Sequence, residues 1–354
     1  MKNKKIRMGI VGLGGIANAV HIPGIQNSKN GIVSALCDVD PEKLKEMSEK
    51  YSVAEERCFT SFTDMMDSGL VDAVSICTPN NAHIPVAMAA LDRGMPFACE
   101  KPIAAEADAA NAFLQAYEKR PVPAMVCFSY RYKSAARYAR ELVQGGALGK
   151  IRHIYAQYFQ AWGEKAPLIW RFIKSVAGSG ALGDLGCHLL DLVRFITGRQ
   201  YVSVSGQLGR FIDERPLPDG NGKGRSDVDD YCNILAKMEG EIPAVFQITR
   251  FAYGRGNYQR IEIYGEKGAL IYDLEDEDRL RLYHADIQDR SKAFQSEAIP
   301  ERFKVDQMQS FLNLVNGESD GLDATIAEGA AISMLMQAAI DSDNSGLRYK
   351  LDKT

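Results

Sequence analysis

Three side chains that could bind a metal or move a proton lie close together in the stretch Gly183–Val193, GDLGCHLLDLV. They are Asp184, His188 and Asp191, at positions i, i+4 and i+7. A helix turns by about 100° per residue, so this spacing predicts one polar row beside a separate leucine stripe. The row could be a metal site, a proton-transfer site or the polar side of an ordinary amphipathic helix. The stretch by itself leaves all three open.

Composition excludes several classes of protein. The chain has 354 residues, and 42 basic and 46 acidic side chains give a formal net charge of −4. This length suffices for about two domains, and no basic excess points to nucleic acid. No apolar run reaches the roughly 18 residues of a membrane span. Seven cysteines are scattered without a CxxC pair, which favours a reducing compartment, the cytoplasm.

A glycine-rich turn follows the first apolar segment, in KIRMGIVGLGGIANAV. Gly12-x-Gly14-x-x-Ala17 has the form of a dinucleotide-binding turn, in which phosphates meet N–H groups at a helix N-terminus. The candidate cofactor contacts in this turn are Gly12, Gly14, Gly15 and Ile16. The same stretch also has the basic head and A-x-A ending of a signal peptide. We favour a strand, turn and helix because the glycine pattern is the more specific signal.

Asp38 ends the next apolar segment, GIVSALCD, 26 residues after Gly12. This is close to where a Rossmann fold places the acid that binds the ribose hydroxyls. A carboxylate there repels a 2′-phosphate, so the sequence favours NAD, with NADP possible. The alternative is an acid that starts a loop or caps a helix, although Asp40 before Pro41 is the better expected N-cap.

Extended and helical segments alternate as far as about residue 130. Helices are expected at 41–51, 80–94 and 106–119, and strands at 72–79, 95–102 and 122–130. This alternation predicts a parallel, doubly wound sheet, whose ligands bind beyond the carboxyl ends of the strands. The polar residues collected there are Thr78, Pro79, Asn80, Glu100, Lys101, Tyr130 and Arg131.

The pattern then changes to successive extended segments. They are expected at 150–162, 201–210, 229–238, 243–251, 258–265, 268–274 and 279–285, with helices at 183–197, 304–316 and 325–341. Strands without intervening helices predict a large, mostly antiparallel open sheet. The Gly/Pro/Asp-rich segment 213–227 is predicted to be a loop. The expected fold is α/β, with a Rossmann domain over 1–125 and an α+β domain over 126–354.

These segments together resemble the family of glucose–fructose oxidoreductase and inositol dehydrogenase, the Gfo/Idh/MocA family. The resemblance covers almost the whole chain. It is carried by GLGGIA, CDVDPEK, TPNNAHIPVAMAALDRGMPFACEKP, GALGKI and GALGDLGCHLLDLVRFITG. It implies an NAD(P)-dependent dehydrogenase of a sugar or cyclic polyol. It also implies that the domain over 126–354 serves substrate binding and oligomerisation, as a homodimer or homotetramer. The last helix, 325–341, would pack back on the first domain.

Oxidising a secondary alcohol requires a base for the hydroxyl proton and a group that steadies the developing alkoxide. We interpret His188 as the base and Lys101 as the group that orients the oxygen. Asp184 would bind a substrate hydroxyl or fix the imidazole, and Asp191 would either share this role or only cap a neighbour. Further candidates are Tyr130, Tyr158 and Trp162 as substrate walls, and Arg171, His83 and Glu100 near the cofactor. His21 is expected only to pack near the first helix.

Two alternative functions stay open at this point. One is a non-catalytic NAD-binding regulator, and the other is an NAD-dependent glycosidase or lyase that oxidises its substrate transiently. Retention of both Lys101 and His188 argues against a pure regulator. A zinc or manganese hydrolase is a distant possibility, because nothing near Asp184, His188 and Asp191 completes a ligand set. The sequence therefore predicts no metal.

Overall fold

The computed structural model describes residues 5–276, 278–285 and 293–351, which form two compact units. The first unit runs to Cys127 and includes Asp306–Ala330. The second consists of Phe128–Val305 and the residues from Ala331 onward. Residues 306–330 therefore belong with the first unit although they follow the second along the chain.

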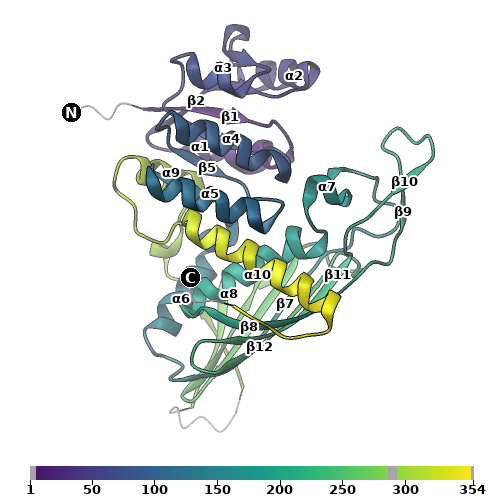
Figure 1. Cartoon of the computed structure of the whole chain (residues 1–354). Coiled ribbons are helices and arrows are strands. Elements are labelled where there is room, and N and C mark those ends of the chain that lie inside the picture. The colour runs from purple at the N-terminus through teal and green to yellow at the C-terminus, as the bar shows by residue number, and fades with distance from the viewer. Residues whose placement is uncertain (1–4, 277, 286–292, 352–354) are drawn as a thin grey trace. The chain divides into compact units, whose positions relative to one another are not determined.

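The first unit is built on a six-stranded parallel sheet in the order β3-β2-β1-β4-β5-β6 (Figure 1). This is the strand order of a Rossmann fold, as the alternating sequence predicted. The strands are β1 (Ile6–Val11), β2 (Gly31–Cys37), β3 (Cys58–Phe59), β4 (Ala73–Ile76), β5 (Phe97–Cys99) and β6 (Ala124–Val126). The short β3 was not predicted, because two partly exposed residues give no periodic signal.

Helices connect these strands and pack against them. They are α1 (Ile22–Asn27), α2 (Pro41–Tyr51), α3 (Phe62–Asp67), α4 (Asn80–Asp92), α5 (Ala107–Lys119) and α9 (Gln307–Val315). A π-helical turn, Ala17–His21, leads directly into α1. Asp40 caps α2 by accepting hydrogen bonds from the N–H groups of Glu42 and Lys43, with Pro41 in the first turn, as expected.

The second unit contains a nine-stranded sheet in the order β16-β15-β14-β13-β7-β12-β11-β8-β17. All neighbours are antiparallel except β7 and β12, so the predicted mostly antiparallel sheet is confirmed. Its strands are β7 (Ile151–Phe159), β8 (Tyr201–Gly209), β11 (Tyr231–Met238), β12 (Ile242–Thr249), β13 (Tyr258–Gly265), β14 (Gly268–Asp273), β15 (Arg279–His284), β16 (Gln295–Ala298) and β17 (Tyr349–Lys350).

Helices lie against this sheet (Figure 1). They are α6 (Ser134–Gln144) and α8 (Cys187–Thr197), together with α10 (Ile326–Ser345), which begins in the first unit. The short α7 (Lys174–Ala177) packs instead on the turn Trp170–Phe172. Gly206 of β8 allows α10 to come close, because a Cβ there would lie 2.2 Å from the carbonyl oxygen of Ala339. No helix in the described residues combines the length and the apolar character that crossing a membrane requires.

The segment predicted to be a loop at 213–227 contains a two-stranded ribbon, so that prediction was wrong. Its strands are β9 (Glu214–Pro216) and β10 (Lys223–Arg225). Arg215 anchors the ribbon, because its buried guanidinium pairs with Asp230 at 3.0 Å and donates to the carbonyl oxygen of Gly163. The composition of the segment did not reveal that one of its arginines is a core residue.

Candidate active site

The glycine turn has the geometry that a dinucleotide requires. Gly12 has a φ of +87°, and a Cβ there would lie 2.7 Å from the backbone of Cys77. Gly14 and Gly15 would direct a Cβ into open space, with no atom within 4 Å. A pyrophosphate can therefore approach their backbone without meeting a side chain, while the fully buried Ala17 lets the helix pack closely. The turn fits NAD.

Asp38 is held at the end of β2 beside this turn. One carboxylate oxygen accepts the N–H of Leu13 at 2.7 Å, and the other accepts the N–H of Asp40 at 3.1 Å. The Lys43 ammonium lies 3.8 Å away. The carboxylate thus stands next to the glycine turn as a fixed negative charge, which is where it would meet the ribose and oppose a 2′-phosphate.

Replacement of Asp38 should weaken the discrimination between the two cofactors. We expect Asp38→Ser to reduce the ratio of kcat/KM for NAD to that for NADP by roughly tenfold or more, about 1.4 kcal/mol, because the repulsion of the 2′-phosphate is lost. Steady-state kinetics with both cofactors measure the ratio. Asp40→Ser is the matched control, since it removes a carboxylate two residues away and keeps a good N-cap. An unchanged ratio in Asp38→Ser would contradict the role.

The loops after β4 and β5 are tied together by a histidine. One ring nitrogen of the buried His83 lies 3.0 Å from the carbonyl oxygen of Thr78, and the other lies 2.8 Å from that of Pro102. Burial lowers the pKa of His83 although both carbonyls oppose the shift. His83 therefore braces the two strand ends that carry Thr78, Pro79, Asn80, Glu100 and Lys101, and the Lys101–Pro102 peptide between them is cis.

His188 lies in the first turn of α8 and packs among aromatic rings. Its ring centroid is 4.8 Å from that of Tyr130 and 6.2 Å from that of Phe128, both in edge-on arrangements. The preceding residues, Leu182–Gly186, form a π-helical turn with i→i+5 hydrogen bonding. Such turns are frequent at functional sites, and this one places Asp184 just before the regular helix. The aromatic neighbours fix the plane of the imidazole.

A hydrogen-bonded network of hydroxyl and amide groups begins at Tyr130. Its hydroxyl lies 2.6 Å from that of Tyr158, and both contact the amide of Asn257. Gln160 donates to the same amide oxygen at 2.9 Å and accepts from the indole N–H of Trp162 at 2.5 Å. Burial and the neighbouring Tyr130 raise the pKa of Tyr158 well above its ordinary value, so its hydroxyl stays protonated. Such groups can both donate to and accept from sugar hydroxyls.

Asp184 is held by two arginines. One of its oxygens lies 3.0 Å from the buried guanidinium of Arg250, and the other lies 3.5 Å from Nε of Arg171. The Arg171 guanidinium also covers the ring of Trp170. These two ion pairs hold the Asp184 carboxylate in place. It lies in the same unit as His188. Arg250 was missed in the sequence, where it only follows the apolar strand AVFQIT.

Asp191 was expected either to share the role of Asp184 or to cap a neighbour, and the structure pairs it with a buried arginine. Its carboxylate makes two charge-assisted hydrogen bonds with Arg131, at 2.8 and 2.5 Å. Both side chains are almost completely buried. A bidentate pair of this kind satisfies the carboxylate inside the protein, and it also explains Arg131, whose role the sequence left open.

The structure brings six of the predicted residues together in the second unit: Tyr130, Tyr158, Trp162, Arg171, Asp184 and His188. It adds Asn257, Gln160 and Arg250, which the sequence did not single out. Asn257 lies between a glycine and the next strand, where an asparagine is read as a turn residue. Only the pairing of β13 with β7 reveals that it faces Tyr158.

Comparison with known proteins identifies the family to which this chain belongs. Residues 6–128 match the model of an oxidoreductase family with an NAD-binding Rossmann fold, and residues 136–271 match the Gfo/Idh/MocA C-terminal domain. The chain belongs to the Gfo/Idh/MocA family. The predicted family and fold class are confirmed, and the chain is an NAD-dependent oxidoreductase.

Several members of the Gfo/Idh/MocA family are similar along most of the chain. Levoglucosan dehydrogenase of Pseudarthrobacter phenanthrenivorans is 31% identical over 275 residues, covering 74% of this chain and 70% of that protein. Myo-inositol 2-dehydrogenase of Thermotoga maritima is 27% identical over 270 residues, covering 76% and 75%. A structure of levoglucosan dehydrogenase with NADH and L-sorbose has a TM-score of 0.91 at 26% identity, covering 99% of this chain and all of that one.

Proposed function

We propose that the protein oxidises a secondary hydroxyl of a sugar, an anhydrosugar or a cyclic polyol to a ketone, with NAD as the oxidant. The observation that carries this proposal is the network of Tyr130, Tyr158 and Asn257 beside His188. It offers neutral donors and acceptors together with aromatic faces, which suits a ring that carries several hydroxyls. The names of the similar dehydrogenases support the same substrate class.

The proposed roles follow from the chemistry of the residues. His188 takes the proton from the reacting hydroxyl, because an imidazole exchanges protons near neutral pH. The Lys101 ammonium orients the same oxygen and stabilises the negative charge that develops on it. Asp184, fixed by Arg250 and Arg171, accepts a hydrogen bond from a substrate hydroxyl or orients the imidazole.

Bound NAD supplies the acceptor for the hydride that leaves the substrate carbon. We propose that Gly12, Gly14, Gly15 and Ile16 receive its pyrophosphate and Asp38 its ribose. Thr78, Pro79, Asn80, His83, Glu100, Lys101 and Arg171 form or support the remaining cofactor surface. Trp162, whose indole N–H is engaged by Gln160, presents its ring as a wall against the C–H side of the substrate.

A substrate panel tests the proposal directly. Purified protein with NAD is offered inositols, aldoses, anhydrosugars and simple secondary alcohols, and NADH formation is followed at the nicotinamide absorbance band. We expect turnover of at least one cyclic polyhydroxy compound and none of simple alcohols, which cannot engage Tyr158 or Asn257. Cleavage of a glycoside without net NADH would contradict the proposal. NAD binding without turnover of any compound would also contradict it.

A further inference from the structure

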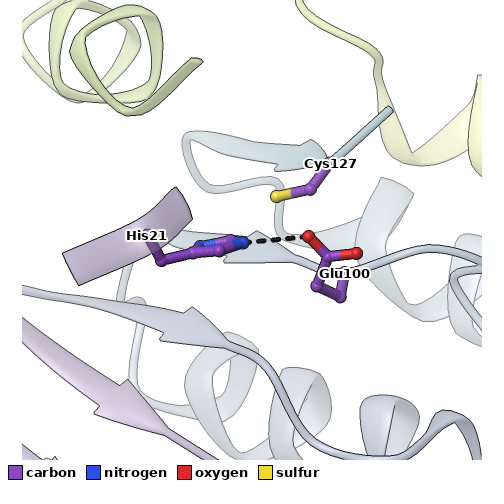
Figure 2. Close-up of side chains that lie close together, drawn as sticks. All are labelled: His21, Glu100 and Cys127. Atoms are coloured by element: carbon purple, nitrogen blue, oxygen red, sulfur yellow. Dashed lines mark hydrogen bonds and ion pairs between the residues drawn. The ribbon is translucent and has the colours of Figure 1, made fainter. Parts of the chain in front are cut away.

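A buried cluster that includes His21, Glu100 and Cys127 lies in the first unit, and Glu100 directly precedes Lys101 (Figure 2). His21 ends the π-helical turn that follows the glycine turn. Its Nε2 lies 2.9 Å from Oε1 of Glu100, and its Nδ1 lies 2.6 Å from the hydroxyl of Ser75. Ser75 is in β4 and Glu100 directly follows β5. The imidazole therefore connects the π-helical turn with strand β4 and with the end of strand β5.

The cluster carries a buried pair of opposite charges. His21 is fully buried and Glu100 is 7% exposed. Burial opposes the charge on the imidazole, but Cys77 and Glu100 raise the pKa of His21 to about 10. Burial likewise opposes the charge on the carboxylate, but His21 and Lys101 lower the pKa of Glu100. The raised pKa of His21 and the lowered pKa of Glu100 both favour an imidazolium paired with a carboxylate. An unpaired carboxylate buried at this depth would be costly.

The same residues are close enough to suggest a metal site, since ligand atoms of His21, Glu100 and Cys127 lie within 4.8 Å of one another. Two ligands about 2.0–2.1 Å from a tetrahedral zinc ion would be roughly 3.3 Å apart. The separation of 2.9 Å between His21 and Glu100 is instead that of a hydrogen bond. Burial also raises the pKa of the Cys127 thiol well above its ordinary value, which opposes the thiolate that a metal needs. A hydrogen bond between the imidazole and the carboxylate therefore accounts for this geometry better than a bound metal ion does.

The Glu100 side chain of this pair also contacts the backbone of Lys101. The second oxygen of Glu100 accepts the N–H of Lys101 at 3.2 Å. On the other side, the carbonyl oxygen of Pro102 lies 2.8 Å from Nδ1 of His83. Buried side chains thus hold the peptide group that precedes Lys101 and the peptide group that follows Pro102. His21 lies five positions after Ile16, so the same imidazole also links this backbone to the glycine turn.

We propose that His21 is a positioning residue for the dehydrogenase reaction: its imidazolium holds Glu100, and Glu100 holds the backbone of Lys101 so that the ammonium meets the reacting oxygen. The inference rests on the role proposed for Lys101. Four groups face the imidazole. Ser75 lies within β4 and Cys77 directly after it, while Glu100 follows β5 and Cys127 follows β6. Lys101 faces Glu100. Because the folded-state pKa is raised, the charged pair is complete below the ordinary pKa of histidine and is lost only as the pH rises through about 10.

Kinetics of paired substitutions test the positioning role. We expect His21→Leu and Glu100→Gln each to lower kcat by roughly 10- to 100-fold, because a small displacement of a reacting group has effects of this size. In His21→Leu the dissociation constant of NADH, measured by fluorescence titration, should change by less than about threefold, and so should the KM of the substrate. His21→Gln combined with Glu100→Gln replaces the pair by a neutral hydrogen bond. It should lose less activity than the product of the losses in His21→Gln alone and Glu100→Gln alone.

A matched control is available in the second unit. His284 and Glu297 also form a histidine–glutamate pair, at 3.7 Å, but both are about one-third exposed. His284→Gln should leave kcat within twofold of the wild type. Equal losses in the His21 and His284 variants, or wild-type kcat in both His21→Leu and Glu100→Gln, would overturn the proposal.

Two measurements are independent of turnover and of the substrate. In protein with ¹⁵N-labelled histidine rings, His21 should show both ring nitrogens protonated at pH 8, and its signals are identified by their loss in His21→Gln. Acylation of Lys101 by a small anhydride, relative to Lys5 and mapped by mass spectrometry, should change at least threefold in His21→Leu. A neutral His21 ring at pH 7, or an unchanged Lys101 rate, would overturn the positioning role even if the variants fold poorly. Failure of the wild type to oxidise any compound would instead overturn the proposed function.

Discussion

His188→Ala should lower kcat by about 10²- to 10⁴-fold, a loss of roughly 3–5 kcal/mol in transition-state stabilisation. The imidazole is the proposed acceptor of the hydroxyl proton, and alanine leaves only water to take it. The rings of Tyr130 and Phe128 that hold the imidazole remain in place, so the fold and NADH binding should be little affected. Stopped-flow or steady-state measurement of NADH formation gives kcat, and fluorescence titration gives the affinity for NADH.

The pH profile separates the loss of a base from other damage. In His188→Ala the remaining rate should rise with pH, because hydroxide replaces the missing base, and added imidazole should restore part of it. Lys101→Ala should also lose activity, but without rescue by imidazole. His153→Ala, a change at a strand histidine that packs against Tyr155 and Tyr264, is the control and should keep full activity. Substantial activity in both His188→Ala and Lys101→Ala would contradict the assigned roles.

The sequence predicted the fold well where one signal repeats. Apolar strands alternate with helices through the first 130 residues, and the predicted parallel sheet is present, with the strand order of a Rossmann fold. The strands of the second sheet could be predicted equally well from the sequence, because buried and exposed side chains alternate along them. The two π-helical turns at Ala17–His21 and Leu182–Gly186 were not predicted. They differ from α-helix by one residue per turn, a difference that composition does not encode.

The candidate site was less predictable because its partners are distant in the chain. Asp38 and the glycine turn could be found from local spacing. Asp184 is fixed by Arg250, which lies 66 residues later, and Tyr158 by Asn257, which lies 99 residues later. The same limit explains His21, whose partner Glu100 is 79 residues away. Such contacts follow from strand pairing rather than from any property of the residues themselves.

Asp191 shows that spacing can single out a residue and still leave its role open. It was predicted to lie in a polar row with Asp184 and His188, where it would either share their role or only cap a neighbour. In the structure it pairs with Arg131 in a site where both side chains are at most 3% exposed. Removing one partner of a buried pair leaves the other as an uncompensated charge, which is far more costly than losing an exposed pair. This difference yields a prediction about stability rather than catalysis.

Asp191→Ala should reduce the free energy of unfolding by about 3–5 kcal/mol, because Arg131 is then left buried without its carboxylate. Urea denaturation followed by circular dichroism measures the change. Glu266→Ala breaks the exposed pair with Arg152 and should cost no more than about 1 kcal/mol. Asp191→Leu combined with Arg131→Met should recover most of the loss, since apolar side chains of similar size replace the whole pair. At temperatures where Asp191→Ala stays folded, its kcat should remain within a few-fold of the wild type. A large fall in kcat with unchanged stability would instead return Asp191 to the active site.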